Sequence, residues 1–148
     1  MPIRPATAND IPALLALDRS SATAAHWSPD QYKQAVTSSE PRRLIFLVQE
    51  GEAISGFLGA LQIVREWEIE NLVVAEKERR RGLGSGLIEA FLEVARQENA
   101  TTVFLEVRES NSRARRLYEK AGFELTGRRQ SYYREPEEDA LVYRLPLT

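Results

Sequence analysis

The longest regular pattern of apolar positions covers residues 83–97, where apolar side chains recur every three or four residues, at Leu83, Leu87, Ile88, Phe91 and Leu92. This spacing predicts a long amphipathic helix that ends at about Gln97. The short apolar run from Leu72 to Ala75 before it is typical of a buried strand. Between the two lie a charged turn and glycines at alternate positions, Gly82, Gly84 and Gly86. The pattern therefore predicts a strand, a glycine turn and a helix in direct succession.

Upstream of this unit, the pattern predicts a short strand at residues 3–5 and then two helices. Asn9 or Asp10 caps the first helix, which carries Pro12 in its first turn. Ser28 caps the second helix, because a proline follows it and Gln31 stands at the third helical position, which is a capping box. Residues 22–26 between the helices are expected to form a loop.

A β-hairpin is expected next. Its strands are Leu44 to Gln49 and Ala53 to Val64, and residues 50–52 form the turn. Gly56 and Gly59 interrupt the second strand, and they predict a bulge or a bend there.

After the long helix, the chain alternates between strands and one more helix. Thr102 to Val107 is expected to be a strand, and the continuous apolarity of residues 101–108 predicts that it is covered on both faces. Asn111 caps a helix that runs through Ala121, and Gly122 ends it. The last strands are residues 123–126, or somewhat beyond, and residues 140–145, joined across the polar residues 135–139.

These elements predict an α/β fold. About seven strands and about four helices in this order form a mixed, mostly antiparallel sheet with helices on both faces. We expect a single domain over residues 1–148.

Composition narrows the possible functions. The chain has no cysteine and one histidine, so a disulfide, a cysteine nucleophile and a metal site are not expected. It has neither a signal-peptide pattern nor an apolar run of the roughly 20 residues that span a bilayer, which predicts a cytoplasmic protein without a membrane partner. The net charge of −2 gives no general attraction to nucleic acid. Arginines nevertheless cluster at 79–81, 113–116 and 128–129, which suggests local contacts with anions.

The glycine turn has the chemistry of an anion site. The first N–H groups of a helix lack partners within the helix and lie at the positive end of its dipole, and glycines let a phosphate approach them. Arg79, Arg80 and Arg81 add charge beside this turn. The turn lacks the lysine of a P-loop and the glycine spacing of a dinucleotide fingerprint. The structural alternative is a glycine-rich helix start with a solvated arginine run.

Glu106 and Tyr118 are the candidates for proton transfer. A carboxylate in a buried strand must be paired, protonated or exposed to a wet cleft, so Glu106 is either an ion-pair partner of Arg108 or another arginine, or a general base. Tyr118 lies two helical turns after Asn111, so the two share one face. The alternative for Tyr118 is a core position beside Leu117 and Phe123.

Two motifs resemble those of the GNAT superfamily of N-acetyltransferases. They are Arg79-x-x-Gly82-x-Gly84 and, over residues 105–123, Leu-Glu-Val-x-x-x-Asn-x-x-Ala-x-x-Leu-Tyr-x-x-x-Gly-Phe. The first is similar to the loop that binds the pyrophosphate of acetyl-CoA. In the second, the resemblance implies that Asn111 contacts coenzyme A and that Tyr118 is the general acid.

A narrower resemblance, to the bacterial ribosomal-protein-alanine N-acetyltransferases of the RimI type, covers most of the chain. It rests on residues 27–28, 70–74, 105–108, 129–133 and 138–140. It implies that Glu106 is the proton acceptor and that acetyl-CoA is bound by Leu72, Val73, Val74, Arg79, Arg80, Arg81, Gly82, Leu83, Gly84, Ser85 and Asn111. The sequence departs from this family at His26, where proline is common, and between Tyr133 and Glu138, where the usual glycine is absent. Both departures lie on the side where the acceptor is expected to bind, so they affect the predicted acceptor and not the predicted binding of acetyl-CoA.

The expected reaction is transfer of acetyl to a primary amine, most readily a protein or peptide amino terminus, possibly of a ribosomal protein. Without a cysteine to carry the acyl group, the amine attacks directly in a ternary complex, with Glu106 as base, directly or through a water. The alternatives are a small-amine acetyltransferase, acting on a polyamine, amino acid or antibiotic, and an acyl-CoA-binding module without turnover.

Aromatic residues are the candidates for acceptor binding. Trp27, Tyr132 and Tyr133 are expected to hold the acceptor, and the charged residues 134, 135 and 137–139 to lie near the mouth of the cleft. Trp67 either lines this cleft or covers the sheet. His26 is expected to have a surface or packing role.

Overall fold

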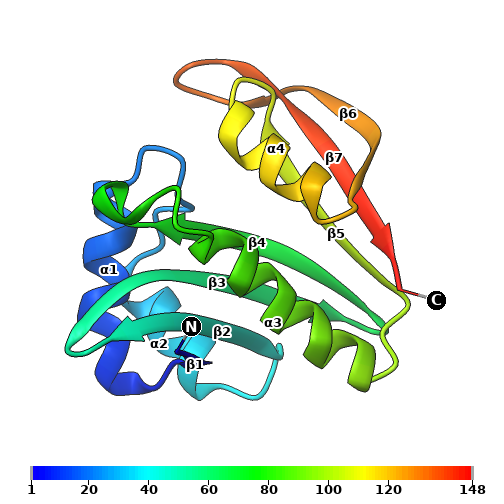
Figure 1. Cartoon of the computed structure of the whole chain (residues 1–148). Coiled ribbons are helices and arrows are strands. Elements are labelled where there is room, and N and C mark those ends of the chain that lie inside the picture. Colours follow the sequence, from blue (N-terminus) through cyan, green and yellow to red (C-terminus); the bar gives the residue numbers. More distant parts are fainter. Residues whose placement is uncertain (1, 148) are drawn as a thin grey trace.

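The computed structural model describes residues 2–147, which form seven strands, four α-helices and two short 3-10 helices (Figure 1). The strands are β1 (Ile3–Pro5), β2 (Arg43–Glu50), β3 (Ala53–Ile63), β4 (Glu66–Val74), β5 (Thr102–Arg108), β6 (Glu124–Tyr133) and β7 (Glu138–Pro146). The helices are η1 (Ala8–Asp10), α1 (Ile11–Ser20), α2 (Pro29–Thr37), η2 (Glu76–Glu78), α3 (Leu83–Gln97) and α4 (Ser112–Lys120).

The strands form one sheet in the order β1-β2-β3-β4-β5-β7-β6. Neighbouring strands are antiparallel except β4 and β5, which are parallel because α3 connects them. The predicted mixed, mostly antiparallel sheet is confirmed. In Figure 1 the half with β1 to β4 and the half with β5 to β7 converge near the carboxyl terminus and diverge towards the other end.

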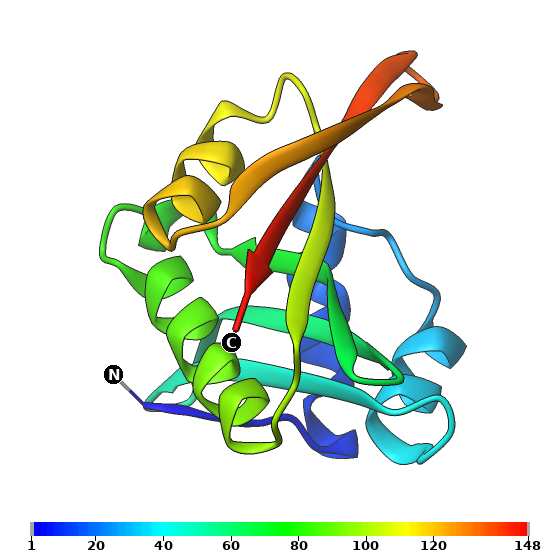
Figure 2. The same cartoon turned by 90° about the vertical axis from the view of Figure 1, so that its right-hand side faces the viewer.

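Helices cover both faces of the first half of the sheet, as predicted. Along β2, Phe46 and Val48 pack in the cluster with α3, and the alternate residues Ile45 and Leu47 pack in the cluster with α1 and α2. Figures 1 and 2 show α3 across the sheet on the face opposite α1 and α2. The α3 face also receives Trp67, which is fully buried and meets the ring of Phe91 edge to face.

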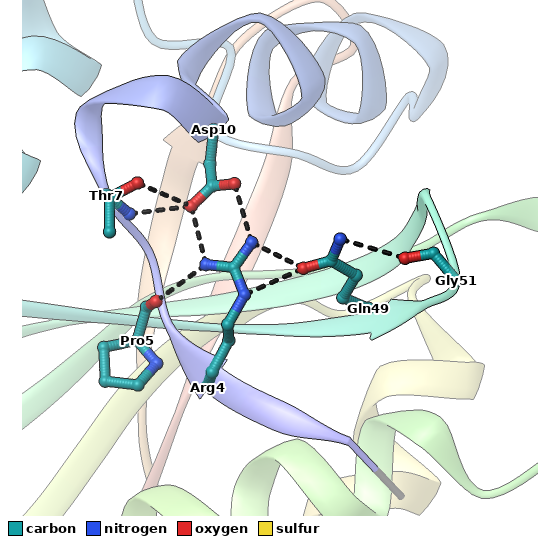
Figure 3. A network of polar contacts seen from close by, with 6 residues as sticks. All are labelled: Arg4, Pro5, Thr7, Asp10, Gln49 and Gly51. Carbon is teal, nitrogen blue, oxygen red and sulfur yellow. Dashed lines mark hydrogen bonds and ion pairs between the residues drawn. The ribbon is translucent and has the colours of Figure 1, made fainter.

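The amino-terminal strand is held by a polar network around Arg4 (Figure 3). Its guanidinium donates to both carboxylate oxygens of Asp10, at 2.8 and 2.9 Å, and to Oε1 of Gln49. Asp10 also accepts from the backbone N–H of Thr7. One side chain therefore joins β1, the start of α1 and β2.

The glycines of β3 mark irregular pairing, as predicted. The register with β2 shifts between Val48, opposite Gly56, and Gln49, opposite Ile54. A Cβ atom on Gly56 would lie 2.7 Å from the carbonyl oxygen of Val73, so only glycine fits this close approach to β4.

A second shift lies between β3 and β4, where Gly59 is opposite Asn71 and Ala60 is opposite Ile69. Glu70 is therefore an extra residue, a β-bulge. Before it, Ile69 packs with α3; after it, Val73 packs with α1 and α2. The bulge thus reverses which alternate residues face each side.

Several expected boundaries and exposures differ from the structure. The strand before the glycine turn begins at Glu66 rather than Leu72, and β6 extends to Tyr133, with Glu138 and Asp139 in β7 rather than in the turn. The expectation that β5 is covered on both faces is wrong. Alternate residues are half-buried, because α1 and α2 pack against β2, β3 and β4 and no helix within residues 2–147 lies over that face of β5.

Candidate active site

The site lies where β4 and β5 separate. Their ladder runs from Glu66 opposite Thr102 to Ile69 opposite Leu105, and the bulge at Glu70 follows at once. A bulge bends its strand and ends regular pairing. Two cavities open in this divergence and share walls formed by Thr23, Leu72, Asn111 and Ala114.

The first cavity has a volume of about 450 Å³ and brings together the predicted acid–base and acceptor residues. Its walls include Trp27, Glu106, Tyr118, Tyr132 and Tyr133, from the loop before α2, β5, α4 and β6. These residues are far apart in the sequence, so the divergence of the strands creates their proximity.

Glu106 faces this cavity from the side of β5 that no helix covers. Its side chain is 13% exposed, and Oε1 lies 3.3 Å from Nη2 of Arg129 on β6. Its Oε2 is buried and has no hydrogen-bond partner among residues 2–147. One oxygen of Glu106 thus forms the ion pair that was expected as one alternative. The other oxygen has no partner, as the general-base alternative requires. Arg108 pairs with Glu138 instead.

Tyr118 approaches the same cavity from α4. Its ring is buried edge to face against Phe123, with the centroids 5.6 Å apart. Tyr118 therefore also occupies a core position beside Phe123, as the alternative interpretation predicted. Burial raises the pKa of its hydroxyl, which therefore stays protonated at neutral pH. Asn111 caps α4 by accepting from the N–H of Ala114 at 3.2 Å.

Arg108 fixes the tyrosines at the edge of the cavity. Its guanidinium lies over the ring of Tyr133, 4.3 Å from the centroid, and donates to the carbonyl oxygens of Arg134 and Pro136. Tyr132 packs edge to face on Tyr133 but is half exposed. Burial, and then the charge of Glu106, raise the pKa of Tyr133 to about 12.

The opposite wall is the loop between α1 and α2, which a buried carboxylate anchors. Asp18 is 1% exposed and accepts from the N–H of Trp27 and the hydroxyl of Tyr32. Nδ1 of His26, whose side chain is half exposed, lies 3.3 Å from Oδ1 of Asp18. Asn71 links Tyr32 to β4 through a hydrogen bond of 3.2 Å.

The second cavity, of about 810 Å³, surrounds the start of α3. Its walls include most of the residues expected to bind acetyl-CoA: Leu72, Val73, Val74, Arg79, Arg80, Gly82, Leu83, Gly84, Ser85 and Asn111. Gly82 is the residue before the helix and has φ 78°, a conformation that glycine adopts without strain. Arg81 does not line this cavity, because its guanidinium pairs with Glu50 and Glu78.

Sequence reasoning missed one carboxylate of the first cavity. Glu68 lines it beside Glu70 and Glu106, and no ion pair within residues 2–147 involves Glu68. The signal was the alternation of charged and apolar residues over 66–70, which predicts one charged face of a strand.

The charged turn after Tyr133 does not supply these carboxylates. Residues 134, 135 and 137–139 do not line the cavity, and Glu138 and Asp139 pair with Arg108 and Arg128. The question left open for Trp67 is also resolved, since this residue covers the sheet.

The second cavity fits a ligand that carries phosphates. Arg79 and Arg80 stand beside the unpaired N–H groups at the start of α3, and neither pairs with a carboxylate among residues 2–147. Across the described range, side chains do not gather into a group able to hold a metal ion, and no helix there is long and apolar enough to cross a membrane.

The sequence matches the acetyltransferase (GNAT) family over residues 11–123. It is 29% identical to the [ribosomal protein bS18]-alanine N-acetyltransferase of Escherichia coli K12 over 94% of this chain and 93% of that protein. It is 30% identical to the N-alpha-acetyltransferase RimI of Mycobacterium tuberculosis, over 80% and 74% of the two chains.

Comparison of the structures relates the chain to the same enzymes. The crystal structure of the Escherichia coli ribosomal-protein-S18-alanine N-acetyltransferase superposes with a TM-score of 0.86 at 27% identity, over 99% of this chain and 93% of that one. The family match and these relatives together define an acyltransferase. The chain belongs to the acetyltransferase (GNAT) family, whose members use acetyl-CoA, and the expected N-acetyltransferase class is confirmed.

Proposed function

We propose that this enzyme acetylates the α-amine at the amino terminus of a protein, with a ribosomal protein as the first candidate. The observation that carries the proposal is the free Oε2 of Glu106 in the first cavity, which Tyr118 also lines. The names of the relatives from Escherichia coli and Mycobacterium tuberculosis supply the acceptor class. Such an acceptor would be met in the cytoplasm.

The second cavity is the proposed site for acetyl-CoA. The N–H groups at the start of α3, with Arg79, Arg80 and Ser85, would hold the pyrophosphate. Residues 72–74 lie beyond the ladder between β4 and β5 while still pairing with β3, so an N–H group there that points away from β3 can polarise the carbonyl of the acetyl group. Asn111 stands at the junction of the cavities.

Glu106 and Tyr118 carry the proton transfers in this proposal. Glu106 takes a proton from the ammonium of the acceptor, directly or through a water, and the neutral nitrogen then forms the new amide bond. Tyr118 gives its proton to the sulfur as the C–S bond of the thioester breaks, and the phenolate regains a proton as the attacking nitrogen loses its second one. The hydroxyl of Tyr118 carries its proton at neutral pH, because burial holds its pKa above the ordinary value.

The first cavity has the features that an extended, cationic amino terminus requires. Trp27, Tyr132 and Tyr133 provide apolar contact, and the edge of β4 beyond Ile69 offers backbone groups for pairing. Glu68 adds a negative charge in the same cavity, which attracts an ammonium group.

Steady-state kinetics with a panel of acceptors tests this proposal. The panel contains peptides that differ only in their first two residues, including the amino-terminal sequence of the organism's own bS18, with spermidine and free amino acids alongside. The proposal predicts the highest kcat/KM for peptides that begin with a small residue such as alanine or serine. It also predicts that Tyr132→Ala and Tyr133→Ala raise KM for peptides and leave KM for acetyl-CoA unchanged.

Two results would contradict it. Faster turnover of spermidine or a free amino acid than of every peptide would make this a small-amine acetyltransferase. Binding of acetyl-CoA without turnover of any acceptor would make it a binding module.

A further inference from the structure

The helix α4 carries a stripe of positive charge that the chemistry above does not use. Arg113, Arg116 and Lys120 are three and four residues apart, so they share one face of the helix. All three line the second cavity. Arg115 points away from it and donates to the hydroxyl of Tyr143 and the carbonyl of Glu109.

The fold gives this stripe no internal partner. Arg113, Arg116 and Lys120 form no ion pair and donate no side-chain hydrogen bond within residues 2–147, whereas Arg81 and Arg128 each pair with two carboxylates. Arg113 also lies in the first turn of α4, which contains no acidic residue, so its charge opposes the helix dipole. Three cations without partners around one cavity, one of them placed against the helix dipole, indicate a ligand that is an anion.

Packing sets the stripe against the anion site of α3. Leu117, next to Arg116 on α4, contacts the position of Gly84 in the first turn of α3. The walls of one cavity therefore carry separate groups of cations: Arg79 and Arg80 beside the start of α3, and the stripe on α4. Figure 2 shows α4 next to the amino-terminal end of α3.

We propose that Arg113, Arg116 and Lys120 form a subsite for the phosphate monoester of acetyl-CoA, the one on its ribose, separate from the pyrophosphate site at α3. The inference rests on acetyl-CoA being the ligand of the second cavity. A phosphate monoester has a second pKa near 6 and carries close to two negative charges at neutral pH, so several cations suit it. Arginine binds phosphate oxygens through paired N–H groups, and lysine adds a point charge.

Calorimetric titration with coenzyme A and with dephospho-coenzyme A, which lacks only this monoester, isolates the subsite. The wild type is expected to bind dephospho-coenzyme A about 10- to 100-fold more weakly, as for the loss of one strong charge-assisted contact. Arg116→Ala and the double variant Arg113→Ala/Arg116→Ala should lose a similar factor for coenzyme A and less than about twofold for dephospho-coenzyme A. Arg96→Ala removes an exposed arginine near the far end of α3 and should change neither affinity.

Other outcomes would show whether the subsite or the assignment of the whole second cavity is wrong. If the variants lose the same affinity for coenzyme A and for dephospho-coenzyme A, the stripe does not bind the monoester, and the proposal is wrong. The proposal is also wrong if the wild type binds the two ligands equally well. If the wild type binds neither ligand, the assignment of the second cavity itself fails. Thermal unfolding completes the test: the variants should unfold at the wild-type temperature or slightly above it, because Arg113 opposes the helix dipole.

Discussion

Cδ2 of Leu117 lies 2.8 Å from the position that a Cβ atom on Gly84 would occupy. The absence of a side chain at Gly84 thus lets α4 pack against the first turn of α3. This contact joins the proposed anion site of α3 to the helix that carries Tyr118.

Adding one methyl group at this contact should weaken the binding of acetyl-CoA. Gly84→Ala forces the end of the Leu117 side chain to move, and α4 shifts with it if the side chain cannot. We expect the affinity for acetyl-CoA, measured by calorimetry, to fall about tenfold, as for an overpacked contact of 1–2 kcal/mol. Leu117→Ala in the same chain removes the clash and should restore most of the affinity. A loss that the second substitution does not recover would show that Gly84 acts through the loop alone.

Removing either of the proposed proton-transfer groups should reduce the rate rather than the binding of acetyl-CoA. Glu106→Gln and Tyr118→Phe are each expected to lower kcat by about 10²- to 10⁴-fold, with acetyl-CoA affinity largely unchanged. The pH–rate profile of Glu106→Gln should also lose its acid limb. Tyr143→Phe is the matched control, because this buried tyrosine lies outside both cavities. Unchanged rates in folded variants would remove Glu106 and Tyr118 from the mechanism.

The stability of the fold should depend on the charge of Glu68. Burial first, and then the charges of Glu70 and Glu106, raise the pKa of Glu68 above 4.5. Since the folded state disfavours the ionised form, the resulting destabilisation appears as the pH rises above 4.5 and is complete above the folded pKa. Glu68→Gln should therefore raise the unfolding temperature near pH 7 and have little effect near pH 4.

Scanning calorimetry over this pH range measures the difference. Glu89→Gln, at an exposed position on α3, serves as the control and should show no such pH dependence. A destabilised Glu68→Gln variant at pH 7 would mean that Glu68 has a favourable partner instead.

The network around Arg4 should contribute to stability in the opposite pH direction. Hydrogen bonds from Arg4 hold the pKa of Asp10 at about 2, below its usual 3.8. The contribution is therefore fully present above pH 4 and is lost as the pH falls through about 2. Asp10→Asn should lower the unfolding temperature by several degrees at pH 7, and its difference from the wild type should shrink between pH 4 and pH 2. A difference independent of pH would assign the effect to packing.

Much of the fold could be predicted because its signals are local. The apolar spacing and Gly82 placed α3 at its observed bounds, and the capping pattern at Ser28 placed α2. Strand β6 was predicted too short, because nearly all of its residues are exposed and an exposed edge strand has no apolar pattern to mark it.

The site could be predicted only in part, for a similar reason. Glu106 stood out as a carboxylate in an apolar run, but its neighbour Glu68 depends on the register of β4 against β5. The bulge at Glu70 changes which side chains face the cavity, and the pairing of Gly59 with Asn71 determines it. Likewise, Arg116 was part of a recognised cluster, but only the contact of Leu117 with Gly84 brings it to the second cavity.

The position of the transferred acetyl group tests the central claim most directly. The enzyme is incubated with acetyl-CoA and a peptide that begins with alanine and contains an internal lysine, and the product is fragmented by mass spectrometry. The same peptide with a blocked amino terminus is the control. We predict one acetyl group on the α-amine, none on the lysine and no reaction of the blocked peptide. Acetylation of the lysine in both peptides, or of neither peptide while small amines react, would contradict the account.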